Sequence, residues 1–336
     1  MVISALPDLL AFQRQVRLTG DLKAQLARAS HEAVTGRYDD ITAAVNGAVG
    51  ETLLLQKALD DIDQDTRINA LSSARLSLIS TSVHSVRDAV DGLAAQGLVA
   101  LTTGDSFSLD TVAVQAEANL RSAMAVLNTS HGNRRLFAGD ATDKLPLATT
   151  DILLADLGAI LTGSPTPAAV AIALDTYFND PAGGFATNIY QGGSADAAPA
   201  YLADGSRIQF GVRADNQAIR DTLRGLSIMA LAGQSGHSIT SSSFKDIFKQ
   251  GTNLVETGNN ALIKLEASIG VFQGLVEDST ARQSEERLTI NIALNSMIER
   301  DQYDAAAELK RLETQVESSY LITARLASLH LSNFLR

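Results

Sequence analysis

The sequence predicts a mainly α protein, an elongated helical bundle or coiled coil formed by N- and C-terminal arms with a small α+β insertion in the middle. Three observations lead to this prediction. Residues 8–145 and 200–336 contain no proline, while five of the six prolines lie within 146–199, so the arms can form long helices that proline would interrupt. Apolar residues in both arms recur at helical spacing. The middle segment is instead rich in glycine and proline turn signals.

The first arm carries two apolar stripes whose members are separated by alternating steps of three and four residues. This is the spacing of the a and d positions in a coiled-coil seam. The stripes consist of Leu76, Ile79, Val83, Val86, Val90 and Leu93, and, nearer the N-terminus, of Leu22, Leu26, Ala29 and Ala33. We therefore expect long helices throughout this arm.

The last arm repeats the pattern. Its stripes consist of Leu265, Ile269, Phe272 and Val276, and of Leu309, Leu312 and Val316. Acidic and basic residues alternate between positions 308 and 313, which is typical of a solvated outer face. From about Thr252 to Asn333 only three glycines interrupt the helical pattern, so the sequence predicts a nearly continuous helix there.

The middle segment predicts short helices over Thr149–Leu161 and Thr166–Phe178. Thr150 or Asp151 is expected to cap the first helix, and Ser164 the second, because small oxygen-bearing side chains accept bonds from the free amides of a first turn. A third helix is expected over Asp215–Leu231.

Turn sequences at 181–184, 191–199 and 203–206 bracket stretches of β-compatible residues. These predict about one hairpin or three short strands. The candidate strands are Ala186–Tyr190, Ala200–Leu202 and Arg207–Val212.

Together these elements suggest three regions. Residues 1–45 and 300–336 form a terminal coiled-coil assembly region, residues 46–140 and 232–299 form a helical rod, and residues 141–231 form the outward α+β insertion.

The composition excludes several functions. The net charge is −11 and there are no cysteines, so neither a basic nucleic-acid-binding face, nor attraction to an anionic membrane, nor a thiolate metal site is expected. Leu157–Leu174 and Gly225–Phe244 are too rich in polar or helix-breaking residues to predict membrane spans. The first 18 residues do not resemble a signal peptide, so export is expected to need no cleaved leader.

No motif predicts catalysis, a metal site or a cofactor. Asp61, Asp63 and Asp65 alternate as in a calcium loop, but Thr66 and Ser72 stand where that loop needs Gly and Glu, so an exposed acidic helix face is the better interpretation. The sequence GQSGH at 233–237 lacks the second glycine of a nucleophile elbow and is expected to be a loop. The histidines lack ligand spacing.

Both ends of the chain resemble the flagellin superfamily. LKAQLARASHEAVTGRYDD at 22–40 is similar to its N-terminal signature, in which a helix ends at a small-residue turn followed by an acidic pair. The proline usual near that pair is absent. The segment 301–336 resembles the family's terminal helix, with Gln315 and Tyr320 in mid-helix and a leucine-rich end.

Two middle segments resemble the hook-associated branch of this superfamily. NRRLFAGDATDKLPL at 133–147 is similar to its Leu/Ile-Phe-x-Gly element, and residues 189–211 are similar to its Tyr-x-Gly element. The resemblance implies that the terminal helices pair in the core of a tube and that the middle projects outward. It implies a structural subunit joining hook to filament in the extracellular bacterial flagellum, with no enzymatic activity.

The implied partners are flagellin, another hook-associated junction protein, an export chaperone and further copies of the chain in a ring or helical assembly. The C-terminal helix would present an apolar face that assembly or the chaperone covers. We expect this face to consist of Leu312, Val316, Tyr320, Leu326, Leu329, Leu331, Phe334 and Leu335, and the N-terminal assembly helix to use Leu18, Leu22 and Leu26.

Three alternatives stay open from the sequence. Filament flagellin, which polymerises with itself, is the nearest one. A coiled-coil signalling protein should show a membrane span or a sensor domain, and an enzyme should show a convergent polar pocket.

Overall fold

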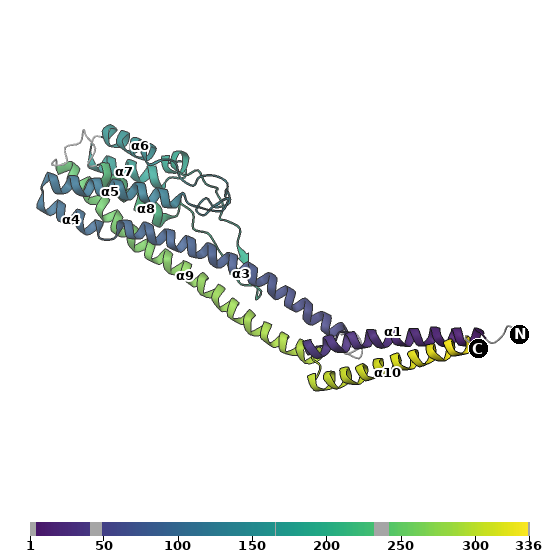
Figure 1. The fold of residues 1–336 in the computed structure, drawn as a ribbon. Coiled ribbons are helices and arrows are strands. Elements are labelled where there is room, and N and C mark those ends of the chain that lie inside the picture. The colour runs from purple at the N-terminus through teal and green to yellow at the C-terminus, as the bar shows by residue number, and fades with distance from the viewer. Residues whose placement is uncertain (1–4, 41–48, 165, 232–241, 335–336) are drawn as a thin grey trace. The chain divides into compact units, whose positions relative to one another are not determined.

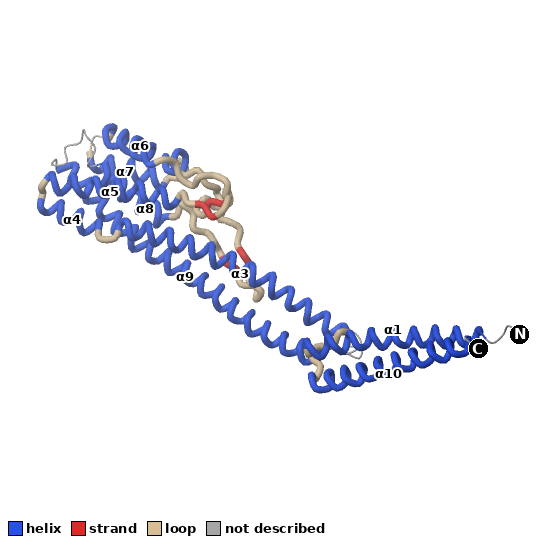
Figure 2. Tube along the Cα trace, in the orientation of Figure 1, coloured by secondary structure: helices blue, strands red, loops and turns tan. Residues whose placement is uncertain are grey.

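The structure, a computed structural model, describes residues 5–40, 49–164, 166–231 and 242–334, and helices make up most of this part of the chain (Figures 1 and 2). In chain order the elements are α1 (Ala5–Thr35), α3 (Val49–Val90), α4 (Leu93–Thr103), α5 (Ser106–Leu127), β1 (Ser130–His131), β2 (Arg134–Arg135), α6 (Thr150–Gly163), α7 (Pro167–Asn179), the π-helix η1 (Phe185–Ile189), β3 (Ala200–Tyr201), β4 (Arg207–Ile208), α8 (Gln217–Leu231), α9 (Ser242–Ile298) and α10 (Gln302–Phe334).

The predicted fold class is confirmed. The longest helix, α9, has 57 residues and α3 has 42. The terminal helices α1 and α10 pack side by side (Figure 1). The strands are confined to the middle of the chain, where each has two residues.

The chain forms two compact units. Unit 1 comprises residues 1–63 and 284–336, and unit 2 comprises residues 64–283. These boundaries are drawn from contacts and fall within α3 and α9. The three-region division expected from the sequence stays a prediction.

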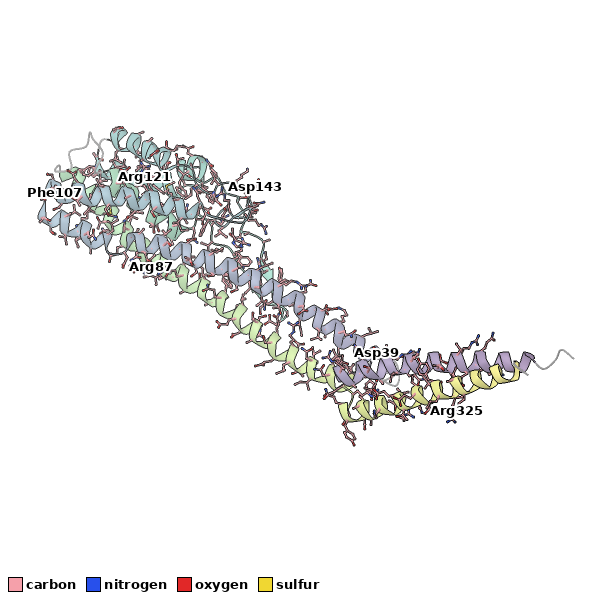
Figure 3. The ribbon with its side chains drawn as sticks, in the orientation of Figure 1. Asp39, Arg87, Phe107, Arg121, Asp143 and Arg325 are labelled. Atoms are coloured by element: carbon pink, nitrogen blue, oxygen red, sulfur yellow. The ribbon has the colours of Figure 1, made fainter. Side chains whose placement is uncertain are left out.

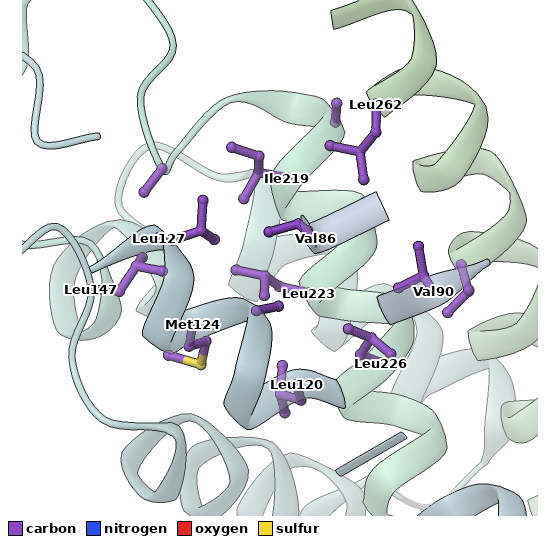
Figure 4. Packing of buried hydrophobic residues seen from close by; sticks show 14 of the residues in the cluster. Val86, Val90, Leu120, Met124, Leu127, Leu147, Ile219, Leu223, Leu226 and Leu262 are labelled. Atoms are coloured by element: carbon purple, nitrogen blue, oxygen red, sulfur yellow. The ribbon is translucent and has the colours of Figure 1, made fainter. Parts of the chain in front are cut away.

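The core of unit 2 is built around α8. Nearly the whole helix is buried, although it is only 15 residues long. Leu223 and Leu226 on α8 pack among Val86 of α3, Leu120 of α5 and Leu262 of α9 (Figure 4). The sequence of α8 is nevertheless not uniformly apolar, since its first half carries Arg220, Asp221 and Arg224 and only its second half, from Leu226 to Leu231, is mainly apolar.

Two glycines bring α8 and α9 close together. A Cβ on Gly225 would lie 2.7 Å from the backbone nitrogen of Val255, and one on Gly258 would lie 2.4 Å from the Thr222 hydroxyl. No side chain fits at these distances, so glycine permits a closer approach of the two helix axes than larger residues would.

The seam predicted for the first arm is buried from Leu76 to Leu93. The helix itself is not continuous over that range. Gly92 adopts a left-handed conformation with φ of 73°, which ends α3 at Val90, so Leu93 starts α4 instead. Glycine takes this conformation without the steric cost that other residues meet.

A buried polar layer crosses the pairing of α3 with α9 within unit 2. The Asn69 side-chain amide donates to the Ser279 hydroxyl at 3.1 Å and to the Gln283 carbonyl oxygen at 2.9 Å. A polar layer in an apolar seam favours one register, because any shift would leave these groups unpaired.

The middle helices agree with the sequence, whereas their caps do not. The helices α6 and α7 match the predicted ranges within two residues. Thr149 stands at the N-cap of α6 without a side-chain cap bond. The N-cap of α7 is Thr166 and not Ser164, because the Thr166 hydroxyl accepts from the Ala169 amide at 3.2 Å.

The strand predictions were partly right. Strands β3 and β4 form the expected antiparallel hairpin, with Ala200 opposite Ile208. Ala186–Tyr190 was wrongly predicted as a strand. It lies largely in η1, which closes with a bond from the Tyr190 amide to the Phe185 carbonyl at 2.7 Å. The β1–β2 hairpin was not expected, although its Gly132-Asn133 turn is a known hairpin signal.

The prediction of one nearly continuous helix from Thr252 to Asn333 was wrong. Helix α9 ends at Ile298 and α10 begins at Gln302. The side chain of Asp301 accepts from the amide of Tyr303 at 2.7 Å, so this residue caps α10 and starts a new helix.

Candidate assembly surface

The paired terminal helices α1 and α10 form the region in which the sequence placed its candidate residues. Leu312 and Val316 of α10 are buried, as is Ala29 of α1, while Leu22 and Leu26 are half-buried. These residues form a thin apolar seam between the two helices. A seam of this size leaves much of each helix surface uncovered.

A polar contact continues the seam toward the chain ends. The Ser319 hydroxyl accepts from the Gln15 amide at 3.0 Å and lies 2.7 Å from the Thr19 hydroxyl. These three residues were not predicted as site residues, because hydroxyl and amide side chains at helical positions give no specific signal. Their bonds fix how α1 and α10 face each other.

Beside this contact, α1 and α10 border a groove of about 630 Å³. Leu18 and Leu22 line it from α1, and Gln315 and Ile322 from α10. Leu18 is 55% exposed, Leu321 63% and Ile322 51%. Together with Val16, which is also exposed, these residues give unit 1 an apolar surface of the kind that marks contact sites.

The remaining predicted residues are distributed as follows. Tyr320 is exposed, and the ammonium of Lys23 on α1 lies 5.1 Å from the centre of its ring. The structure describes the backbone, but not the side chains, of Leu326, Leu329, Leu331 and Phe334 in α10. Leu335 lies outside the described residues. The structure therefore brings Leu312, Val316, Leu22 and Leu26 together and places Leu18 and Tyr320 on the surface.

The predicted turn after α1 contacts the junction between α9 and α10, within unit 1. Gly36 has a φ of 67° and ends the helix. The Tyr38 amide donates to the Ile298 carbonyl at 3.0 Å, and the Arg300 amide donates to the Gly36 carbonyl at 2.9 Å. The segment at 35–40 thus joins the end of the N-terminal helix to the start of the C-terminal one.

A buried charge pair holds this turn. The Arg300 guanidinium forms an ion pair with Glu32, whose other carboxylate oxygen accepts from the Asp39 amide at 2.9 Å. The guanidinium also lies 5.6 Å from the centre of the Tyr38 ring. Figure 3 shows Asp39 at this end of α1. Sequence reasoning missed both partners, since 268 positions separate them.

The acidic run in the first arm lies on α3, as the sequence indicated. Asp61 pairs with Lys57 at 2.8 Å, and Asp63 pairs with Arg287. Within the residues that the structure describes, no His, Asp or Glu side chains gather in a group of three or more that could hold a metal ion. The GQSGH sequence at 233–237 lies outside the described residues.

The fold and this surface define a class of protein: a helical protein whose terminal helices pair and whose middle segment forms a separate helical core with two small hairpins. No described helix is both long enough and apolar enough to cross a membrane.

Comparison with known proteins identifies the relatives of this fold. Residues 252–335 match the family described as the bacterial flagellin C-terminal helical region, which confirms the resemblance found at that end of the sequence. No protein with a curated description matches the chain.

Two solved structures share the fold. FlgL from Bacillus cereus is 17% identical with a TM-score of 0.53, and the alignment covers 72% of this chain and 100% of FlgL. A protein assigned as flagellar hook-associated, from Vibrio parahaemolyticus, is 15% identical with a TM-score of 0.53, covering 73% of this chain and 95% of its own.

Proposed function

We propose that this chain is a structural subunit of the bacterial flagellum that joins the hook to the filament. The observation that carries the proposal is the combination of a flagellin-type C-terminal region at 252–335 with the fold of FlgL and of a flagellar hook-associated protein. The paired terminal helices and their exposed apolar residues support a role in assembly.

The assembly surface in this proposal is the outer side of the α1–α10 pair. Leu18 and Tyr320, together with Leu321 and Ile322, would be covered by neighbouring subunits, because an exposed apolar surface gains free energy when a partner excludes water from it. The segment that we assign to the export chaperone before assembly is the C-terminal one, with Leu326, Leu329, Leu331, Phe334 and Leu335.

The proposed partners are flagellin on one side, another hook-associated junction protein on the other, and further copies of this chain. The proposed location is the extracellular flagellum. Residues 1–45 and 300–336 would line the assembly, residues 46–140 and 232–299 would form the rod, and residues 141–231 would face outward.

Deletion of the coding sequence tests this function by electron microscopy of the cells and assay of flagellin in the medium. Hooks that lack filaments, with flagellin released into the medium, are the expected result. Intact filaments on the deletion strain would overturn the proposal.

Filament flagellin is the second candidate, and it is favoured by the matched family, which is that of flagellin itself. The same experiment separates the two functions. If this chain is the flagellin, the deletion strain has bare hooks and releases no other flagellin into the medium.

A further inference from the structure

A cavity of about 370 Å³ lies in unit 2. Ile68 and Arg75 of α3 form one wall, Arg134 of the β1–β2 hairpin forms another, and Phe210, which follows β4, closes a third side. The cavity thus combines apolar walls with the positive charges of Arg75 and Arg134, and Arg135 of the same hairpin also lines it.

The two arginines lack carboxylate partners. Among the residues that the structure describes, neither Arg75 nor Arg134 forms an ion pair. The Arg75 guanidinium instead lies over the ring of Phe210, whose centre is 4.2 Å from the guanidinium carbon. By contrast, Arg87 and Arg121, which Figure 3 labels, pair with Glu266 and Glu117 of their own unit.

The electrostatics of the cavity favour an anion. Burial, and then the nearby charge of Arg134, lowers the pKa of the Arg75 guanidinium, which nevertheless stays protonated at neutral pH. Two like charges at a partly buried site repel each other, and a carboxylate between them would remove this repulsion. Its bonds to guanidinium groups would be of the strong, charge-assisted kind.

A matching surface lies on α9, in unit 1. Glu285, Leu288 and Ile292 follow one another at steps of three and four residues, so they share one helix face. Leu288 and Ile292 are each 62% exposed. Within the described part of the chain the Glu285 carboxylate has no ion pair. This face presents a carboxylate beside aliphatic side chains, which is the chemistry that the cavity requires.

We propose that the Arg75–Arg134 cavity binds the Glu285–Leu288–Ile292 face of α9 in a second copy of this chain. A copy is the favoured occupant because the chain has a net charge of −11 and carries this acidic and apolar face itself. Such a contact joins two different surfaces, so it repeats from subunit to subunit and generates a ring or an open helical array. The inference rests on the proposed function, in that the chain assembles with itself.

Disulfide trapping tests this contact directly, because the chain has no cysteine of its own. One full-length variant carries His131→Cys at the cavity and the other carries Leu288→Cys on α9. Mixed under mild oxidation, the two are expected to form a cross-linked heterodimer. As a matched control, Val114→Cys replaces Leu288→Cys, since Val114 is 64% exposed on α5.

Charge reversal supplies the second arm. Arg134→Glu in the cavity chain is expected to abolish the cross-link, and Glu285→Arg in the partner chain is expected to restore it. Both positions are exposed, and circular dichroism checks that each variant stays folded. Absence of the cross-link, a Val114→Cys product of equal yield, or a cross-link insensitive to Arg134→Glu would each overturn the contact.

The deletion experiment and the cross-linking experiment together distinguish failure of this contact from failure of the proposed function. Hooks without filaments, together with no cross-link, overturn the contact and leave the junction function in place. Intact filaments together with a charge-dependent cross-link overturn the junction function and leave the contact in place.

Discussion

At the scale of residues, the turn after α1 depends on a charge pair that is mostly removed from water. The side chains of Arg300 and Glu32 are only 19% and 10% exposed. Loss of one partner would leave the other buried and uncompensated, which costs far more than loss of an exposed pair.

Arg300→Ala is therefore expected to destabilise unit 1 by about 3–5 kcal/mol. Chemical denaturation followed by circular dichroism measures the change. The matched control is Arg311→Ala, which removes the exposed pair with Glu308 and is expected to leave stability nearly unchanged, because water screens an exposed pair. Equal effects of the two substitutions would contradict the role given to Arg300.

Asp221 on α8 provides a prediction of pH dependence. Burial raises the pKa of its carboxyl group, although a bond from Gln217 and the charges of Arg224 and Arg220 oppose this effect and the charge of Asp175 adds to it. Because the native pKa exceeds the unfolded one, the protonated carboxyl stabilises the fold at acidic pH. This contribution is lost as the pH rises through the raised native pKa.

Asp221→Asn should accordingly increase the free energy of unfolding at neutral pH, and the gain should disappear as the pH falls below the carboxyl's ordinary range. Denaturation curves at a series of pH values measure this difference. Asp143→Asn at an exposed position of unit 2 (Figure 3) serves as the control and should show no such trend. A pH-independent gain for Asp221→Asn would argue against the assigned cause.

At the scale of elements, the contact between α8 and α9 is set by glycine. Gly225 lies in a helix interior, where glycine alone is usually unfavourable because it loses more backbone entropy on folding than alanine does. Its presence is explained by the Val255 backbone 2.7 Å from where a Cβ would lie.

Gly225→Ala is expected to destabilise unit 2 by about 1–3 kcal/mol, because overpacking forces the two helices apart. Gly158→Ala is the matched control, since Gly158 also lies within a helix but has no atom within 4 Å of its Cβ position. That control should stabilise the protein by up to about 1 kcal/mol. Thermal unfolding compares the pair, and a stabilised Gly225→Ala variant would rule out the close contact.

The helix boundaries illustrate what periodicity predicts and what it does not. The apolar stripe from Leu76 to Leu93 predicted the buried residues correctly, but it did not predict that the helix ends before Gly92. An apolar repeat indicates which side chains face the core. A short break between two helices can leave those side chains facing the same way, so the repeat does not reveal the break. The same holds at 299–301, where Asp301 caps a new helix.

At the scale of the whole molecule, stability and assembly should depend on different residues of α10. Leu312 is buried against α1, whereas Leu321 is largely exposed. Removing buried methyl groups leaves a cavity, while removing exposed ones leaves the monomer nearly unchanged.

Leu312→Ala is expected to cost about 2–5 kcal/mol of stability. Leu321→Ala should change stability by less than about 0.5 kcal/mol and still reduce motility of a complemented deletion strain, because it trims the proposed assembly surface. Urea denaturation and swimming assays provide the two measurements. Full motility with Leu321→Ala and Ile322→Ala combined would exclude this surface from assembly.

The sequence by itself determined the helical class, the burial of the apolar stripe from Leu76 to Leu93 and the β3–β4 hairpin. These features depend on neighbours a few positions away, since helical spacing and turn residues act locally. Only the tertiary structure decided the pairing of Arg300 with Glu32, the contact of Arg75 with the Phe210 ring, and the π-helical course of Phe185–Ile189. Each of these features depends on groups brought together from distant parts of the chain or on the packing around them. The conformational preferences of neighbouring residues do not determine such partners.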